Sequence, residues 1–139
     1  GHCCDAGHTY ALQGPSAYLG GDVTILVDDD IHDICVMGGK LIGSPIVMAA
    51  GDPAIGERVW TLGYPRGTFA ISDGYWSGRD EDGDGTCSID AIGGFSGSPI
   101  LNTAGRAVGV LNKGYLGHSV TFVVPLEHLR RDINRALKL

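Results

Sequence analysis

A serine, an aspartate and a histidine in this sequence have the types that nucleophilic catalysis requires. A serine hydroxyl is a weak nucleophile until a histidine accepts its proton, and a carboxylate must fix the tautomer of that histidine. Ser96 lies in "GGFSGSP", His2 in "GHC" and Asp33 in "DICVM", so the chain order is His, Asp, Ser. Taken alone, the motif around Ser96 also fits a tight turn between strands, because Gly, Ser and Pro are turn residues.

Taken together, the three motifs resemble those of the trypsin-like serine peptidases of the chymotrypsin fold. Between them, "GERVWTLGYPRGTFAISDGYWSG" resembles the central stretch of the HtrA-like and glutamyl-endopeptidase-like branches. The segment "GRAVGVLNKG" resembles the strand that follows the nucleophile, so the similarity covers nearly the whole chain. The resemblance implies an all-β fold, a double antiparallel β-barrel. It also implies a serine endopeptidase that hydrolyses peptide bonds through an acyl-enzyme.

The resemblance implies a role for each matching residue. His2 would be the general base, Asp33 its orienter and Ser96 the nucleophile. The backbone N–H groups of Gly94 and Ser96 would form the oxyanion hole. Glycine suits position 94, because a backbone that turns its N–H inward often needs a dihedral angle that only glycine tolerates.

Three further residues are predicted to contact the substrate. Asn112 and Gly114 would line the strand that pairs with the substrate backbone by β-augmentation. Asp90 stands where the family has the base of the specificity pocket, and a buried carboxylate there would favour Arg or Lys before the cut bond. With a different loop length Asp90 only borders the pocket, and both alignments remain open.

Two positions depart from the family pattern. Phe95 stands where the digestive peptidases carry an aspartate that pairs with a newly cut amino terminus, so activation by that salt bridge is not expected. Only Gly1 precedes His2, whereas the family has two strands before its histidine. An incomplete first barrel exposes strand edges and leaves His2 at a frayed end. The alternative function is therefore a catalytically inactive homologue or fragment that acts as a protein-binding module.

Two other assignments compete with this one. His8, in "DAGHTY", is a rival for the general base because it also follows a small residue at a workable distance from Asp33. We favour His2, since "CDAG" then forms the turn after it and "HTYALQG" the next strand. An α/β-hydrolase is excluded, because "GFSGS" lacks the second glycine of G-x-S-x-G and the order Ser, Asp, His cannot be met.

Short apolar runs, broken by Gly, Pro or Asp, predict the strands that would position these residues. The predicted strands are 9–13, 22–27, 33–37, 46–49, 58–62, 68–76, 86–90, 99–102, 106–112 and 119–124. Short strands at this regular spacing are typical of a sandwich or barrel.

The last segment of the chain changes its hydrophobic period. Leu126, Leu129, Ile133 and Leu137 recur at steps of three and four after Pro125, which predicts an amphipathic helix that packs against the sheet. The basic residues of this segment are assigned to its solvated face: Arg130, Arg131, Arg135 and Lys138.

The sequence contains no linker or internal repeat, so residues 1–139 are predicted to form one peptidase domain. The expected parts are a partial first barrel over about 1–55, a second barrel over 56–124 and a C-terminal helix over 125–139.

The net charge and the hydropathy of the sequence restrict the classes of molecule that this protein is expected to bind. The formal net charge of −6 argues against nucleic acid, because phosphate binding needs clustered Lys and Arg. No apolar run approaches the roughly 18 residues that span a bilayer, so no membrane partner is expected. The expected partner is a protein or peptide substrate. The oligomeric state and the compartment stay open, because the resemblance covers secreted, periplasmic and viral enzymes.

No cofactor or metal is expected. Cys3, Cys4, Cys35 and Cys87 form no C-x-x-C pair, so they predict no zinc site, although one disulfide is possible. The segment "RDEDGDGTCSID" matches the first positions of an EF-hand loop, but Ala91 stands where a bidentate Glu is needed. We therefore predict a solvated acidic hairpin loop.

Overall fold

The chain forms two compact units in the computed structural model, and each is described by itself. The first comprises residues 1–45 and 127–139, and the second comprises residues 46–126. The structure describes residues 9–11, 22–41, 43–114 and 120–139. In these ranges no helix combines the length and the apolar character that crossing a membrane requires.

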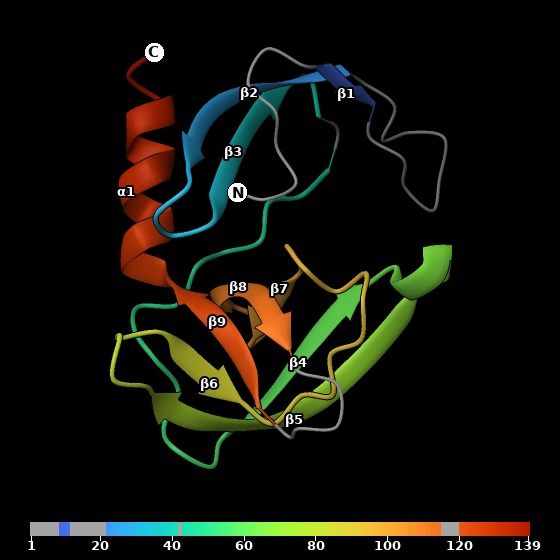
Figure 1. Ribbon diagram of the computed structural model, residues 1–139, viewed down its shortest axis with the longest axis vertical. Helices are drawn as coiled ribbons and strands as arrows, with labels where there is room; N and C mark the ends of the chain where they lie inside the picture. Colours follow the sequence, from blue (N-terminus) through green and yellow to red (C-terminus); the bar gives the residue numbers. More distant parts are fainter. Residues whose placement is uncertain (1–8, 12–21, 42, 115–119) are drawn as a thin grey trace. The chain divides into compact units, whose positions relative to one another are not determined.

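The first unit contains a three-stranded antiparallel sheet in the order β1-β2-β3, together with the C-terminal helix (Figure 1). The bounds are β1 (Thr9–Ala11), β2 (Asp22–Asp29), β3 (Ile34–Gly39) and α1 (Leu126–Ala136). The side chains of Val23, Val27 and Ile34 form the buried face of β2 and β3. In Figure 1 α1 lies beside these two strands, and Arg131 of α1 forms an ion pair with Asp29 at the end of β2.

The buried face of α1 differs from the predicted one. Leu129 is buried, but Leu137 lies beyond the end of the helix with 79% of its surface exposed. Asp132 and Ala136 take its place on the inner face, and Asp132 is completely buried. The hydrophobic period missed Asp132 because it counts apolar residues only. A carboxylate can be buried here because cations of the same helix pair with it.

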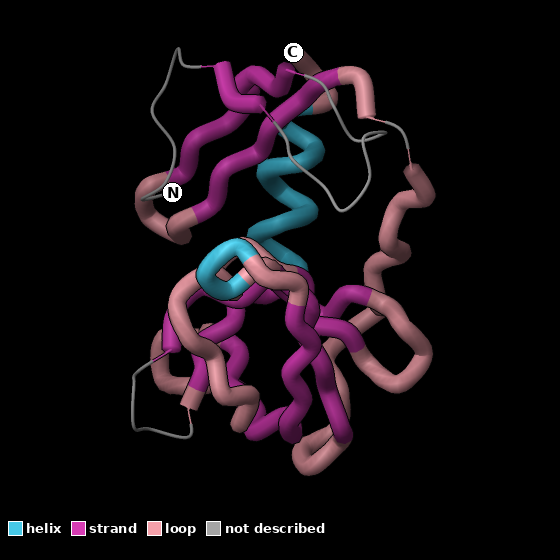
Figure 2. The backbone as a smooth tube through the Cα atoms, turned by 90° about the vertical axis from the view of Figure 1, so that its right-hand side faces the viewer, coloured by secondary structure: helices cyan, strands magenta, loops and turns pink. Residues whose placement is uncertain are grey.

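The second unit is a closed antiparallel barrel in the strand order β4-β5-β6-β9-β8-β7. Figure 2 shows its strands, in magenta, curving around a common centre. The bounds are β4 (Arg58–Gly63), β5 (Ala70–Arg79), β6 (Gly85–Cys87), β7 (Pro99–Leu101), β8 (Ala107–Gly114) and β9 (Thr121–Pro125). A short 3-10 helix, Pro65–Gly67, connects β4 to β5. The all-β class predicted from the sequence is confirmed, with one closed barrel and one C-terminal α-helix among the described residues.

The barrel interior follows from alternation along its strands. In β4, buried and exposed residues alternate without interruption, so that every second side chain points into the core. The core side chains are contributed by all parts of the barrel: Val59, Trp76, Cys87, Ile89, Ile100, Val108, Leu111 and Val123. Burial raises the pKa of the Cys87 thiol, because the thiolate would lose its hydration.

The predicted strand 46–49 is wrong. This segment makes only one isolated parallel bridge, between Met48 and Ala107. The bridge consists of two backbone hydrogen bonds, from the Ala49 N–H to the Ala107 carbonyl at 2.8 Å and from the Ala107 N–H to the Val47 carbonyl at 2.9 Å. Pro45 directly precedes the segment and Pro53 lies four residues after Ala49, and neither residue has an N–H group to donate to a longer ladder.

Candidate active site

Ser96 lies in the nucleophile loop, residues 92–98, which precedes β7. Its side chain is exposed. The loop is tight because Gly94 has a φ of 104° and Gly97 a φ of 83°, both in the left-handed region that favours glycine. The conformation expected for Gly94 from the sequence is therefore present, whereas its role in catalysis stays a prediction.

The Ser96 hydroxyl donates a hydrogen bond to the main-chain carbonyl of Asn112 at 3.0 Å. Asn112 is on β8, where it interrupts the β8–β9 register between Leu111 and Lys113. A backbone carbonyl holds the hydroxyl in place but cannot take up its proton. For attack on a carbonyl carbon, the hydroxyl must rotate toward a base.

The backbone N–H groups of the loop divide into two sets. Those of Phe95, Gly97 and Ser98 donate to the carbonyls of Ile92 (3.3 Å), Leu111 (2.8 Å) and Phe95 (2.9 Å). Those of Gly94 and Ser96 donate to no acceptor in the described part of the chain. These two are the N–H groups that the sequence assigns to the oxyanion hole.

Phe95 is buried directly beneath this loop. Only 3% of its surface is exposed, whereas Gly94 and Ser96 on either side are both exposed. The loop therefore places an aromatic ring inward between two residues that face solvent. Sequence reasoning recognised Phe95 only as a departure from the family pattern and did not predict its burial.

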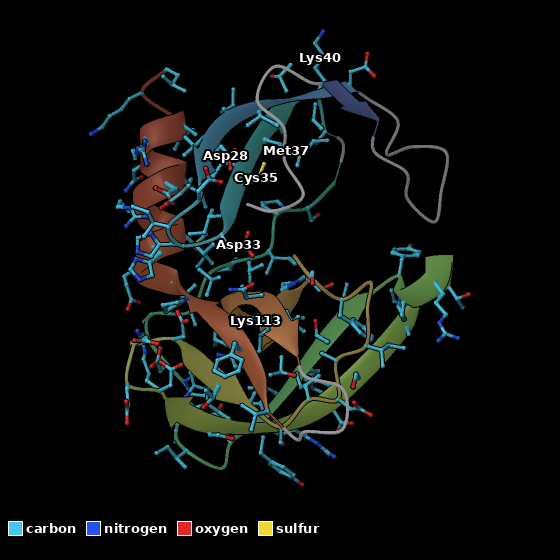
Figure 3. The ribbon with its side chains drawn as sticks, in the orientation of Figure 1. Asp28, Asp33, Cys35, Met37, Lys40 and Lys113 are labelled. Carbon is cyan, nitrogen blue, oxygen red and sulfur yellow. The ribbon has the colours of Figure 1, made fainter. Side chains whose placement is uncertain are left out.

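The end of β8 has a partner on only one side among the described residues. β9 pairs with β8 as far as Gly114, whereas the β7 ladder ends at the pair Pro99 and Val110. Past Leu111, the edge of β8 next to the nucleophile loop carries the Asn112 carbonyl and continues through Lys113, labelled in Figure 3, to Gly114. An extended peptide could add to this edge as a strand.

Asp90 lies close to that edge but is not buried. Its side chain is exposed, and its carbonyl accepts a hydrogen bond from the Ser72 hydroxyl at 3.4 Å. The next residue, Ala91, is so close to Gly114 that a Cβ built on Gly114 would lie 3.0 Å from the Ala91 carbonyl oxygen. The idea of a buried carboxylate at Asp90 is therefore wrong, because this residue lies in a solvated segment. A role for Asp90 in substrate preference stays a prediction.

Asp33 is the last residue of the β2–β3 turn, residues 30–33, and is labelled in Figure 3. It has a φ of 55°, which aspartate tolerates better than most residues. Asp33 belongs to the first unit and Ser96 to the second, and each is positioned within its own unit. His2 and its rival His8 lie outside the described residues.

A charged cluster that the sequence reasoning did not predict surrounds the β2–β3 turn. Asp29, at the end of β2, accepts hydrogen bonds from the Ile31 N–H at 3.0 Å, the His32 N–H at 3.3 Å and the His32 Nδ1 at 2.8 Å. Burial alone would raise the pKa of Asp29, but the hydrogen bonds from the His32 side chain and backbone outweigh it. The pKa is lowered from 3.8 to about 2. His32 lies in the turn, and the centroid of its ring is 4.0 Å from that of His128.

Arginines of α1 complete the charged cluster. Arg131 pairs with Asp29 and also donates to Asp132 from Nε at 3.0 Å and from Nη2 at 2.9 Å. Arg135 donates to Asp132 at 3.2 Å. Arg131 and Arg135 are exposed, as the sequence predicts, but their guanidinium groups also reach inward and neutralise a buried carboxylate. The signal in the sequence was the spacing Asp29 to His32 and Asp132 to Arg135, three residues apart in each case.

The acidic loop after β5 folds onto its own backbone. Asp80 Oδ1 accepts the N–H groups of Asp82 at 3.0 Å and Asp84 at 2.9 Å. Across the described ranges, no group of three or more His, Cys, Asp or Glu side chains is arranged to hold a metal ion. Cys35 is disulfide-bonded.

Solved structures share the fold of this chain. The chain is similar to the serine endoprotease from Yersinia pestis, with a TM-score of 0.77 and 18% identity over 85% of this chain and 45% of that one. Two structures of the Rv3671c protease of M. tuberculosis H37Rv, both in an inactive form, match with TM-scores of 0.70 and 0.71 and 22% identity. They are matched over 84% of this chain and 65% and 68% of theirs. This chain thus spans less than half of the Yersinia protein.

The amino-acid sequence also matches a known family. The family described as "Trypsin-like peptidase domain" is matched over residues 19–110, more than half of the 139 residues. This range includes Asp33 and Ser96, whereas His2 and His8 precede it. No curated protein matches the chain. From its sequence match and its fold, the chain belongs to the family of trypsin-like peptidase domains.

Proposed function

We propose that this domain is a serine endopeptidase in which Ser96 is the nucleophile and His2 and Asp33 complete the catalytic triad. The observation that carries the proposal is the nucleophile loop, which exposes the Ser96 hydroxyl beside two N–H groups that no described acceptor uses. Membership of the trypsin-like peptidase domains supports a hydrolase that acts on proteins or peptides.

The proposed reaction has two halves. In the first, the Ser96 hydroxyl turns away from the Asn112 carbonyl, His2 accepts its proton, and the oxygen attacks the carbonyl carbon of the substrate. The amine leaves with the proton from His2, which gives an acyl-enzyme. In the second half, water gives a proton to the same histidine and attacks the ester carbon; the bond from this carbon to Ser96 Oγ breaks, the histidine returns its proton to Oγ, and the acid is released. Asp33 would hold the histidine in the correct tautomer.

The backbone N–H groups of Gly94 and Ser96 would stabilise the negative charge that develops on the substrate carbonyl oxygen. One such donor typically lowers the barrier by about 3–4 kcal/mol. Both N–H groups belong to a rigid turn, so they need little reorganisation when charge develops on that oxygen.

The substrate would bind as an added strand along the edge of β8. Asn112 offers its carbonyl next to Ser96, and Gly114 lets the end of β8 lie close to Ala91, where a Cβ would be 3.0 Å from the Ala91 carbonyl oxygen. Asp90 is proposed to favour Arg or Lys before the cut bond, but only modestly, because an exposed carboxylate is screened by water. Asp90→Asn should therefore lower the preference for Arg over Ala at that position without abolishing cleavage.

A fluorophosphonate probe tests the nucleophile, because it reacts with an activated serine. The full-length protein should be labelled, Ser96→Ala should not, and Ser77→Ala, which removes another exposed hydroxyl, should be labelled at the rate of the wild type. If the folded full-length protein is not labelled, the peptidase proposal fails and the protein-binding alternative gains support.

The same probe distinguishes the two candidate bases. His2→Ala should abolish labelling, and His8→Ala should leave it within about threefold of the wild type. The reverse result would assign the general base to His8.

A further inference from the structure

The nucleophile loop is anchored at one point. Between residues 92 and 97, Phe95 is the single buried residue, with 3% of its surface exposed. Its immediate neighbours in the chain, Gly94 and Ser96, carry the two N–H groups assigned to the oxyanion hole. The orientation of these two peptide groups is thus set by the same short turn that places the Phe95 ring in the barrel.

The anchor contacts the end of β4. A Cβ built on Gly63, the last residue of β4, would lie 3.0 Å from Phe95 Cδ1, 2.6 Å from Ser98 Oγ and 3.4 Å from the Gly94 carbonyl oxygen. The loop therefore rests directly on the Gly63 backbone. The second contact is at Gly94, where a Cβ would lie 2.6 Å from Pro65 Cα.

Two backbone hydrogen bonds hold the main chain of Phe95 within the loop. The Phe95 N–H donates to the Ile92 carbonyl, and the Phe95 carbonyl accepts the N–H of Ser98. With both polar groups of Phe95 used inside the loop, the residue cannot rotate as a unit unless these bonds break. The N–H groups of Gly94 and Ser96 stay available for a ligand as long as the ring stays buried.

We propose that Phe95 is a positioning residue that sets the two oxyanion donors by apolar packing against Gly63. This inference rests on the proposed serine endopeptidase, and it adds how the catalytic loop is kept assembled. A ring buried in the barrel carries no charge. The loop geometry therefore needs neither a cation nor a newly formed chain end as its partner.

The kinetic consequence is a loss in kcat rather than in substrate affinity. If the ring no longer fills its place, the two N–H groups shift relative to the developing oxyanion, and a misplacement of about 1 Å can cost on the order of 100-fold in rate. The edge of β8 that would bind the peptide backbone does not include Phe95. KM should therefore change little.

The test uses two pairs of variants in the full-length protein. Phe95→Ala should lower kcat and the rate of fluorophosphonate labelling at least about 100-fold, with KM within about threefold, and Phe95→Leu should recover most of the loss. Val59→Ala, which truncates another core residue of the same barrel, should lower the melting temperature but leave kcat within about threefold. Rates are compared at a temperature at which every variant is folded.

Gly63→Ala moves the loop from the opposite side and does not depend on the Phe95 variants being folded. The added methyl group should push Phe95 and Ser98 outward and lower kcat by a similar factor. Gly51→Ala is the matched control, because a Cβ at Gly51 meets nothing within 4 Å. Unchanged kcat in both Phe95→Ala and Gly63→Ala would overturn the proposal.

Hydrogen exchange of the Gly97 and Ser98 amides separates this proposal from the proposed function. Both N–H groups are hydrogen-bonded in the loop, so their exchange should be faster in Phe95→Ala than in Val59→Ala. If the wild type is not labelled but exchange accelerates in this way, the anchor is supported and the peptidase function is not. If exchange does not accelerate, the anchor is wrong, whatever the labelling shows.

Discussion

The nucleophile loop and the β2–β3 turn are both short connections that carry a candidate catalytic residue, but different forces hold them. In the nucleophile loop, backbone hydrogen bonds and the buried Phe95 ring fix Ser96. In the β2–β3 turn, the residues next to Asp33 are fixed by charge, through Asp29, His32 and Arg131.

This difference predicts that the nucleophile loop and the β2–β3 turn respond differently to pH and salt. Apolar packing and neutral hydrogen bonds depend little on pH and salt, whereas a cluster of ionised groups depends on both. The two parts of the proposed triad should therefore fail under different conditions.

The largest loss of stability should come from Asp132, which is completely buried and pairs with Arg131 and Arg135. Asp132→Ala removes a buried, hydrogen-bonded side chain, but the two cations that it leaves are 40% and 60% exposed, so the protein should be destabilised by about 1–3 kcal/mol. Urea unfolding followed by circular dichroism measures this loss. The exposed carboxylate variant Asp82→Ala should cost much less. Equal losses would mean that the charged cluster does not stabilise the first unit.

In the nucleophile loop, Gly94→Ala should affect catalysis more than stability. A Cβ at residue 94 would lie 2.6 Å from Pro65 Cα, and the φ of 104° is strained for alanine. The displaced N–H should lower kcat by roughly 10²–10³-fold, at every pH at which the protein is folded. Steady-state kinetics on a peptide substrate measure it. An active Gly94→Ala enzyme would remove this residue from the oxyanion hole.

Acid should weaken the β2–β3 turn through Asp29, whose pKa falls from 3.8 to about 2 on folding. A lowered pKa stabilises the folded state fully above pH 3.8, and this contribution is lost as the pH falls through about 2. It amounts to roughly 2 kcal/mol, because one pKa unit corresponds to about 1.4 kcal/mol. Chemical unfolding between pH 6 and pH 2 should show a shallower loss in Asp29→Asn. Identical slopes in both proteins would contradict this origin of the shift.

The smallest effect is expected for the ion pair between Arg58 and Asp73 on the outer face of β4 and β5. Its atoms are 2.7 Å apart, but the side chains are 56% and 48% exposed. Asp73→Asn should therefore change the free energy of unfolding by less than about 1 kcal/mol. A larger, salt-dependent change would show that surface charge contributes to the stability of the barrel as well as to that of the first unit.

Much of the fold could be predicted from local patterns in the sequence. Alternation of apolar residues located most of the strands, and the left-handed conformation of Gly94 followed from its place before the serine. The segment 46–49 misled this reasoning because an apolar run shows that residues can be buried, not that they find a partner strand.

The charged cluster could not be predicted in the same way. Asp29 and Arg131 are 102 residues apart, and no local pattern links them. The inner face of α1 was incompletely predicted for a different reason, because the hydrophobic period counts only apolar residues, whereas Asp132 is buried with cations of its own helix as partners. Likewise, comparison with the family pattern of the nucleophile motif showed that Phe95 is unusual. The position of its ring becomes clear only from its contact with Gly63 at the end of β4.

The buried thiol of Cys87 allows the opening of the barrel to be measured by the rate at which a reagent modifies this thiol. It is completely inaccessible on β6, and burial raises its pKa. A thiol reagent can therefore reach it only when the strands separate, so the rate of its modification, read on the peptide that contains it, reports the population of open barrels. Bound substrate or inhibitor should slow that modification in proportion to how strongly it stabilises the closed form.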